Sequence, residues 1–446
     1  MNPLHPDDPD FSPPDNPRER LGNSPRRPRH PKEQGIGYSF RAFRHSNYRL
    51  FWFGALASNT GSWLSNLTVP YVLYSLTGSV LWVALAAVAQ FVPGVVLGPL
   101  GGSLADRYDR RKVIIYTQSG LAVVALLMWA NWASGLQDPA LLLWLIALVG
   151  VLNGLNMPAW QSFVSDLVPR EDLLSAVTLN SLQFNAARSL GPAIAGILLA
   201  GLGPSWAFFL NAVSFLFVIA ALLIVTNGIA ASKDKPDRGV FGQFLQALNY
   251  VRTQPGIVMG ILISVMIGLL GNPLFQLTVV FAEDIFRVGP TGLGLLNAAL
   301  GVGAVIAAPL VSGWSRFLPT GLVAQWGLTA YGLGLIAFGL TDHFVLALVS
   351  LVLVGASFLS VISGVNTSIQ LIVTDDMRGR VFAVRHMFFT ASMPAGAVLQ
   401  GLLADFWGVQ ATVILAGSVM LAGVLALSLI RGRSGFRGLD DRLDAG

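Results

Sequence analysis

Arg188 is the residue whose type and position most strongly indicate a chemical role. It lies about three helical turns beyond Ala176, where an apolar stretch begins. An arginine at membrane depth costs about 2.5–3.5 kcal/mol on insertion scales, so it is expected to face a bundle interior or a wet cavity. There its guanidinium could anchor an anionic or carbonyl-rich molecule. The alternative is an arginine that snorkels or bonds to a helix, and we favour the anchor because Arg188 is deep.

Neutral amide and aromatic side chains form a second candidate set. They recur at the i, i+3, i+4 and i+7 spacing that places residues on one helix face. Such a face could line a cavity for bulky amphiphiles with many hydrogen-bond acceptors. Buried Asn and Gln also join membrane helices, and for any single residue that explanation is equally good. The candidate substrate-binding residues are Arg188, Asn59, Trp63, Asn66, Asn153, Asn156, Trp160, Asn272, Gln276, Ser363, Asn366 and Gln370.

Carboxylates that could carry a proton are scarce in the apolar stretches. No Asp or Glu lies in the middle of any of them. Asp106, at the inner end of the second stretch, and Asp405, near the outer end of the eleventh, are the candidates for proton coupling. Each could equally be an ordinary carboxylate at a helix end or in a loop.

An enzyme is not indicated. The chain has no cysteine, which removes disulfides, thiolate metal sites and cysteine nucleophiles together. None of the five histidines lies beside a carboxylate pair or at metal-ligand spacing. The sequence therefore predicts no catalytic site, no metal and no cofactor.

The elements that must position these residues are membrane-spanning helices. Hydrophobic residues make up 54% of the chain and charged residues 11%, far from the balance of a soluble domain. Apolar stretches of about 20 residues follow one another from Leu50 to Ile430. They do not alternate as barrel strands would, so an all-α polytopic membrane protein is expected. The twelve predicted spans are 50–75, 80–105, 113–133, 140–165, 176–202, 205–226, 255–281, 290–314, 321–341, 344–372, 381–406 and 410–430.

A duplication is suggested when the chain is compared with itself at an offset of 205 residues. Gly191 and Gly196 of the fifth span fall on Gly396 and Gly401 of the eleventh, as two duplicated six-helix halves require. Glycines recur in membrane helices for packing alone, which is the alternative explanation. We favour two pseudo-symmetric halves. The expected units are a tail (1–36), the N-terminal half (37–226), a linker (227–254), the C-terminal half (255–430) and a second tail (431–446).

Basic residues set the expected orientation. With both termini in the cytoplasm, nearly all loop Lys and Arg lie inside and only Arg287 falls in an outer loop. Residues 1–36 hold nine prolines and no apolar run, so a disordered tail is expected and not a signal peptide. The net charge of +5 reflects this inside bias and does not indicate nucleic-acid binding. The linker stretch 241–251 has roughly helical amphipathic spacing and is expected along the membrane surface.

The loop after the second span, residues 102–112, has the sequence GSLADRYDRRK. It resembles the loop signature of the major facilitator superfamily, a small-residue helix end followed by Asp-Arg, a turn and two basic residues. Gly102 would let a neighbouring helix approach, and Asp106 would offer a carboxylate to a helix N-terminus or an arginine on the opposite half. Arg107 and Arg110 belong to the same candidate gating loop. Asp109 replaces a common glycine. The alternative is a basic loop with no gating role.

Residues 185–196, NAARSLGPAIAG, resemble in part the Gly-Pro motif of exporting branches of the superfamily. Gly191, Pro192 and Gly196 would permit a bend or a close helix crossing. Alanine occupies two positions, 187 and 195, that are usually glycine. With further matches outside the tails, the chain is most similar to the branch that holds the enterobactin exporter and the macrolide-efflux proteins.

The resemblance implies a secondary carrier that exports drug-, macrolide- or siderophore-type amphiphiles by alternating access, coupled to protons. It also implies that spans one, four, seven and ten line the cavity. Asp106 is expected to meet Arg380, or the start of span eleven, only when the carrier is open to the outside. Span four lacks the basic residue frequent in drug–proton antiporters. Nutrient import or lysolipid flipping remain alternatives, and a channel is less favoured. The expected partners are a small molecule, protons and the lipid of a bacterial inner membrane.

Overall fold

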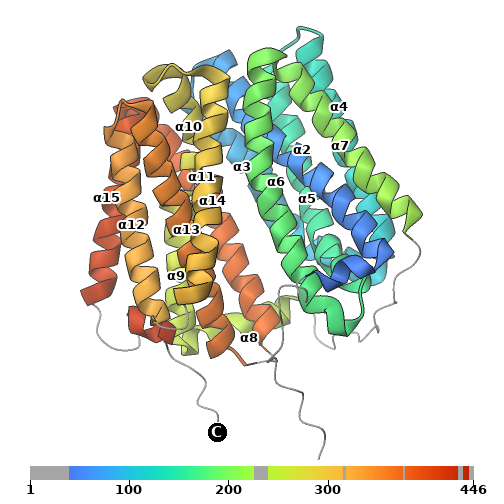
Figure 1. Ribbon diagram of the computed structural model, residues 1–446, viewed down its shortest axis with the longest axis vertical. Coiled ribbons are helices and arrows are strands. Elements are labelled where there is room, and N and C mark those ends of the chain that lie inside the picture. Colours follow the sequence, from blue (N-terminus) through green and yellow to red (C-terminus); the bar gives the residue numbers. More distant parts are fainter. Residues whose placement is uncertain (1–39, 226–239, 315–317, 375–376, 430–434, 441–446) are drawn as a thin grey trace, which may run out of the picture.

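The computed structural model describes residues 40–225, 240–314, 318–374, 377–429 and 435–440, and within these ranges its elements are helices joined by turns (Figure 1). Its elements are η2 (Arg41–Arg44), α2 (Ser46–Thr77), α3 (Val80–Arg107), α4 (Arg110–Ala133), α5 (Pro139–Asp166), η3 (Arg170–Asp172), α6 (Leu173–Gly201), α7 (Pro204–Ile224), α8 (Val240–Thr253), α9 (Pro255–Met266), η4 (Ile267–Gly271), α10 (Leu274–Val280), η5 (Phe281–Ile285), α11 (Gly289–Trp314), α12 (Thr320–Leu340), α13 (Phe344–Ile372), α14 (Arg378–Trp407), α15 (Val409–Leu429) and η6 (Phe436–Asp440).

Helix occupies each of the predicted span ranges within the described residues. The seventh range corresponds to a continuous run, Pro255–Ile285, in which the π-helices η4 and η5 interrupt the α-helix. In the described residues, ten of these helical segments are long and apolar enough to cross a membrane. α2 and α6 are long but more polar, and the candidate residues Asn59, Trp63 and Arg188 lie on them.

Turn chemistry fixes several helix boundaries. Asp138 caps α5 by accepting a hydrogen bond from the backbone N–H of Ala140, and Pro139 supplies the first helical residue. Gly203 and Gly408 precede α7 and α15 with φ angles of 80° and 84°, a region that favours glycine. These two glycines are also related by the offset of 205 residues.

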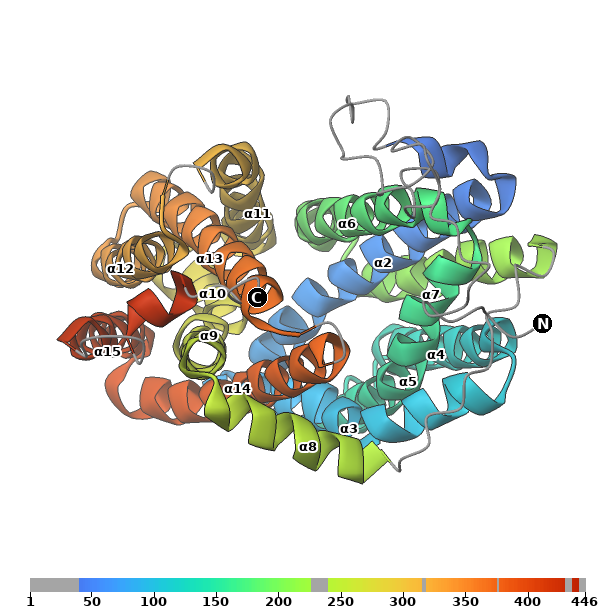
Figure 2. The ribbon, with the colours of Figure 1, turned by 90° about the horizontal axis from the view of Figure 1, so that it is seen from below.

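The helices pack as two groups, which Figure 2 shows from below. The first group contains α2–α7, in which α2 packs on α6 and α7, and α3 packs on α5. The second group contains α9–α15, in which α13 packs on α11 and α12. α6 packs on α11 and α14 packs on α3, and these two pairs join the groups. α8 lies across α9 and α14.

Equivalent glycines occupy equivalent crossings in α6 and α14. A methyl group added at Gly191 would lie 2.5 Å from the Cβ of Trp63 on α2, and one added at Gly396 would clash with the carbonyl oxygen of Leu269 on η4. Both glycines therefore allow a close crossing with a neighbour inside their own group.

The next glycine pair allows the crossings between the groups. A methyl group added at Gly196 would lie 2.8 Å from the Cα of Gly294 on α11. One added at Gly401 would lie 2.8 Å from the Cβ of Ala84 on α3. The α6–α11 and α3–α14 contacts thus use glycines that the sequence offset relates to each other.

The two ends of the bundle differ. At one end, called here the α8 end, lie α8, η2, η3 and η6, and the ribbons of the two groups diverge toward it (Figure 1). At the opposite end the groups are joined by hydrogen bonds. The Tyr74 hydroxyl donates to Asp284, and the backbone N–H of Val80 donates to Asp405 over 3.3 Å. The groups are therefore held together at the end opposite α8.

The units expected at the chain ends and between the halves are described only in part. Residues 1–36 lie outside the described residues, as does most of the linker before α8 and most of the tail after position 430. Within the described part of that tail, η6 packs against α9 and α12. The backbone N–H of Gly321, in the first turn of α12, donates to Asp440 over 3.0 Å.

Candidate substrate-binding site

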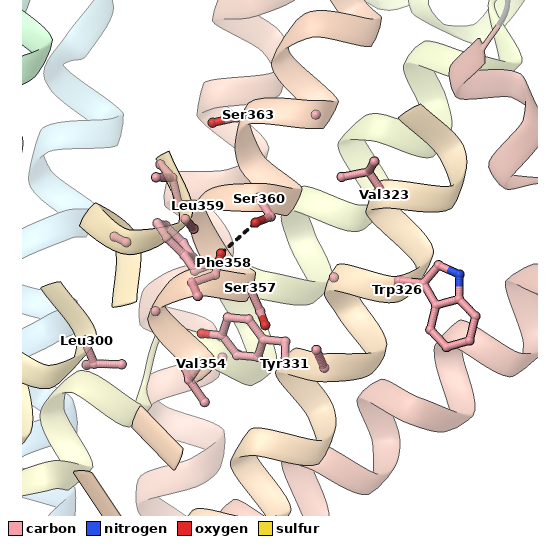
Figure 3. A pocket seen from close by; sticks show the side chains of 18 of the residues that line it. Leu300, Val323, Trp326, Tyr331, Val354, Ser357, Phe358, Leu359, Ser360 and Ser363 are labelled. Carbon is pink, nitrogen blue, oxygen red and sulfur yellow. Dashed lines mark hydrogen bonds between the residues drawn. The ribbon is translucent and has the colours of Figure 1, made fainter. Parts of the chain in front are cut away.

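A cavity of about 1260 Å³ lies between the two groups and among the helices of the second. Its lining comes from α6, η4, α10, α11, α12, α13 and η6. Figure 3 shows the part formed by α12 and α13, where Tyr331, Ser357 and Phe358 are labelled. Small-molecule sites typically enclose about 300–1,000 Å³, so this cavity has room for a bulky molecule.

Arg188 reaches this cavity between aromatic rings from both groups. The carbon of its guanidinium lies 5.5 Å from the ring centroid of Trp63 and 4.9 Å from that of Phe358. The Trp63 ring in turn packs edge-on against Phe184 and Phe275, with centroids 5.9 Å apart in each case. The guanidinium is therefore positioned by ring faces.

The Arg188 charge is only partly compensated. Among the described residues it has no hydrogen-bond or ion-pair partner, although it lines the cavity. A desolvated cation–π contact contributes about 0.5–2 kcal/mol. Burial of an arginine at membrane depth costs about 2.5–3.5 kcal/mol. Two ring contacts thus roughly offset the cost, and the N–H donors of the guanidinium stay available to a ligand.

Neutral polar groups complete the lining. Asn185 and Asn272 line the same cavity as Arg188, and Asn185 donates to the carbonyl oxygen of Ser181 over 2.8 Å. Ser363 lines the part formed by α13. Asp440 is the one carboxylate among the described lining residues, and its Oδ1 accepts from Gly321. The site therefore combines one cation, aromatic rings and neutral hydrogen-bonding groups.

Three of the candidate residues from the sequence line the cavity, and a fourth supports it. Arg188, Asn272 and Ser363 are part of the lining, and Trp63 holds the guanidinium of Arg188. Gln276 lies apart, at a second cavity of only about 10 Å³ between α3, α10 and α14.

Other candidates on α2 join helices of the first group. The Asn59 amide donates to Gln183 of α6 over 3.3 Å, and the Asn66 oxygen accepts from Gln90 of α3 over 2.9 Å. These contacts are interhelical hydrogen bonds, the alternative to cavity lining that the sequence allowed for each amide.

The candidates on α5 do not line the cavity in this conformation. The Asn156 oxygen accepts from Thr117 of α4 over 2.9 Å. Trp160 is buried against Phe51, with ring centroids 4.9 Å apart. Asn153 is exposed. The α5 face that was expected to line the cavity therefore contacts α4 through Asn156 and the core of the first group through Trp160.

Arg385 is a buried cation that the sequence analysis missed. Its Nε donates to Ser264 of α9 over 3.0 Å, and its Nη1 donates to Asn366 of α13. Its position four residues into the predicted span 381–406 was the available signal. Asn366 therefore serves Arg385, and Gln370, one helical turn further along α13, is exposed.

Gly102 does not have the expected role. A methyl group added there would meet open space, whereas one added at the neighbouring Gly101 would clash with the carbonyl oxygen of Gly154 on α5. Adjacent helix positions point about 100° apart, so the residue that faces α5 is Gly101. The expectation of a close approach at Gly102 was wrong by one position.

The charged residues of the 102–112 loop have separate surroundings. Asp106 and Arg107 are exposed. Arg110 pairs with Asp166 at the end of α5, with Nη1 2.9 Å from both carboxylate oxygens. On α14, Arg380 donates to Gln246 of α8 over 3.1 Å. In this conformation, with the groups joined at the opposite end, Asp106 is exposed and Arg380 binds α8.

Comparison with known families identifies the chain. A family model described as transmembrane secretion effector matches residues 38–436, nearly the whole sequence. This chain is a member of that family, within the major facilitator superfamily.

Relatives of the chain are named as exporters and transporters of several molecules. It is 22% identical to a staphyloferrin A transporter of Staphylococcus aureus, over 80% of this chain and 89% of the relative. It is 23% identical to a macrolide efflux protein of Streptococcus pyogenes, over 87% and 97%. It is 26% identical to an enterobactin exporter of Escherichia coli, over 86% and 91%.

Solved structures show the same fold. A bacterial homologue of the lysosomal transporter Spinster, in an inward-facing and occupied conformation, aligns with a TM-score of 0.72 at 14% identity, covering 91% of this chain and 100% of that one. A bacterial ferroportin homologue in an inward-facing state aligns with a TM-score of 0.67 at 18% identity, covering 86% and 99%. The family match and the apolar helices together make the chain a multi-span membrane protein of a transporter family.

Proposed function

We propose that this protein is a twelve-span secondary carrier that exports small amphiphilic molecules across a bacterial inner membrane by alternating access, coupled to protons. The observation that carries the proposal is the cavity between two helix groups that are joined at one end and diverge at the other. A site between two bodies that rock about it is the arrangement that alternating access requires.

Twelve spans are proposed because α2 and α6 belong to the bundle although they are more polar than the other long helices. α2 packs along α6 and α7, and α6 packs on α11, so both helices have neighbours on part of their surface. Polar residues in spanning helices belong where protein or a cavity faces them. With α2 and α6 counted, residues 37–226 and 255–430 each hold six spans, and the glycine crossings at 191, 196, 396 and 401 support two related halves.

The proposed binding set is Arg188, Asn272 and Trp63, with Ser363 at the α13 side of the cavity. Rings and neutral amides suit amphiphiles that carry hydrogen-bond acceptors. Relatives named for the transport of staphyloferrin A, macrolides and enterobactin support a small-molecule cargo. The other amides, Asn59 and Asn66, support the site by holding α2 to its neighbours.

The proposed gate at the α8 end is made by Asp106 and the start of α14 near Arg380. In the described conformation Asp106 is exposed and Arg380 binds Gln246. Closing this end would bring the carboxylate to the N-terminus of α14, where the helix dipole favours a negative charge. With both termini and the basic loops in the cytoplasm, the α8 end is the cytoplasmic end and the described conformation is open inward.

Proton coupling is proposed at the same two carboxylates that the sequence singled out. Asp405 accepts a hydrogen bond from the first N–H of α3, across the two groups. Protonation would remove the charge that the helix N-terminus favours and would weaken this contact. Asp106 would respond in the same way at the other end, so each end could be released by one proton.

The test is transport by purified protein in proteoliposomes with an imposed pH gradient. Dyes, macrolides and catecholate siderophores are loaded in turn, and flux is followed in both directions, because solved relatives of this fold also include a nucleoside transporter. We expect saturable flux of at least one compound, driven out of the compartment that the α8 end faces. Flux that follows no gradient, or only uptake toward the α8 side, would contradict an exporter.

A further inference from the structure

The cavity carries a positive charge without a balancing negative one nearby. Arg188 is the one cation among the described lining residues. The one described lining carboxylate, Asp440, lies on η6 against the first turn of α12 and accepts a hydrogen bond from Gly321. A molecule that enters beside Arg188 therefore meets a cation, and no described carboxylate is placed to attract a positive ligand there.

The ring contacts hold Arg188 and leave its hydrogen-bonding capacity free. Trp63 and Phe358 contact the cation through their π systems and offer it no conventional hydrogen-bond acceptor. The five N–H donors of the guanidinium are therefore not used by the rings. Phe358 comes from the second group and Trp63 from the first, so the guanidinium lies at the boundary of the groups. Its donors can bind two oxygens of one acid group at once, the geometry that arginine prefers.

Aromatic surface surrounds the same point. Phe275 lines the cavity and packs on Trp63, and Tyr331 lines it from α12. A flat ring system that carries an acid group could pack on these side chains while its oxygens reach Arg188. A flat ring system that carries a cation would gain the same packing but would face the charge of Arg188 without a partner.

We infer that the cavity selects anionic aromatic amphiphiles over cationic ones, with the guanidinium of Arg188, held between Trp63 and Phe358, as the anion anchor. The inference rests on the proposed transport function and names the substrate class of that site. It predicts that compounds bearing a carboxylate bind better than amine-bearing compounds of the same ring size.

Equilibrium binding tests the selection without requiring transport. Fluorescein is an anion at neutral pH, and tetramethylrhodamine methyl ester is a cation on the same xanthene ring system. Binding of each dye to the purified full-length protein is measured by fluorescence polarisation. We expect tighter binding of fluorescein, and Arg188→Gln should weaken it by about 10- to 100-fold, as expected for loss of a charged hydrogen bond, while barely changing the cationic dye.

Two comparisons guard against a variant that does not fold. Arg252→Gln removes an exposed arginine at the end of α8 and should leave both affinities unchanged. In the unmodified protein, benzoate should displace fluorescein and benzylamine, of nearly the same size, should not. Equal displacement by the two, tighter binding of the cationic dye, binding of neither dye, or a preference that survives Arg188→Gln would overturn the inference.

Different results contradict the proposed transport function and the selection for anions. If a pH gradient drives the cationic dye through proteoliposomes and excludes fluorescein, the carrier assignment stands and the selection for anions is wrong. If fluorescein binds through Arg188 but no compound is transported in either direction, the binding inference stands and the carrier assignment is wrong.

Discussion

Asp405 provides the sharpest test of how the two groups are held together. Its carboxylate accepts a hydrogen bond from the backbone N–H of Val80, 3.3 Å away, across the end opposite α8. The residue that precedes α3, Ser79, makes no side-chain cap. Asp405 therefore acts as the cap of α3 from the other group, and opening this end would break the contact.

The expected cost of Asp405→Ala follows from that geometry. A carboxylate at a helix N-terminus contributes about 0.5–2 kcal/mol. Because the bond is long and Asp405 is exposed, we expect the lower part of this range, about 0.5–1 kcal/mol, which converts to a population shift of about 2- to 5-fold. The shift should favour the conformation that opens at this end.

Spin labels measure the shift in a chain that has no natural cysteine. Leu136 follows α4 and His343 precedes α13, in turns that Figure 1 shows at this end, one in each group. Both residues are exposed and suit a labelled pair. The longer distance should gain population in Asp405→Ala. Asp342→Ala is the matched control, because Asp342 bonds to Gln410 within the second group. An unchanged distance distribution in Asp405→Ala, or an equal change in the control, would refute the assignment of Asp405 as a closing contact.

Three further predictions use other contacts. Arg188→Ala should lower transport efficiency about 10-fold or more with normal membrane insertion, and Arg188→Lys should restore transport only partly. Transport at the wild-type rate in Arg188→Ala would exclude Arg188 as a substrate anchor. Asp106→Asn should favour the conformation open at the α8 end by about 5- to 150-fold and should slow turnover. This gate would be excluded if the distance between residues 106 and 380 stayed the same in states trapped open at either end. Gly196→Ala should lower the melting temperature because its methyl group meets Gly294, whereas Gly201→Ala meets open space and should not.

The helices were predictable from the sequence because an apolar stretch of spanning length leaves the backbone few alternatives. The close crossings at Gly191 and Gly196 were predictable for a related reason, since glycine in such a helix usually marks a close neighbour. The sequence placed Trp63 and Arg188 on different spans, and their contact became visible only in the structure.

The rotation of each helix about its own axis was not predictable. Spacing shows that Asn156 and Trp160 share a face, but it does not say whether that face meets a cavity or another helix, and here they meet α4 and Phe51. For the same reason the sequence did not show that Gly101, and not Gly102, is the residue that α5 approaches closely. Phe358 and Tyr331 could not be singled out, because an aromatic residue in an apolar helix looks the same in the sequence whether it lines a cavity or a core.

Counterflow of a transported compound tests the central claim, alternating access around one cavity, most directly. Proteoliposomes are loaded with a high concentration of the unlabelled compound and diluted into a trace of the labelled one, without any pH gradient. If the binding site reorients faster with the compound bound than when empty, the label accumulates transiently above its equilibrium level. This overshoot should be strongly reduced in Arg188→Ala. Label that only rises to its equilibrium level, at the same rate with or without internal compound, would contradict alternating access and indicate a channel.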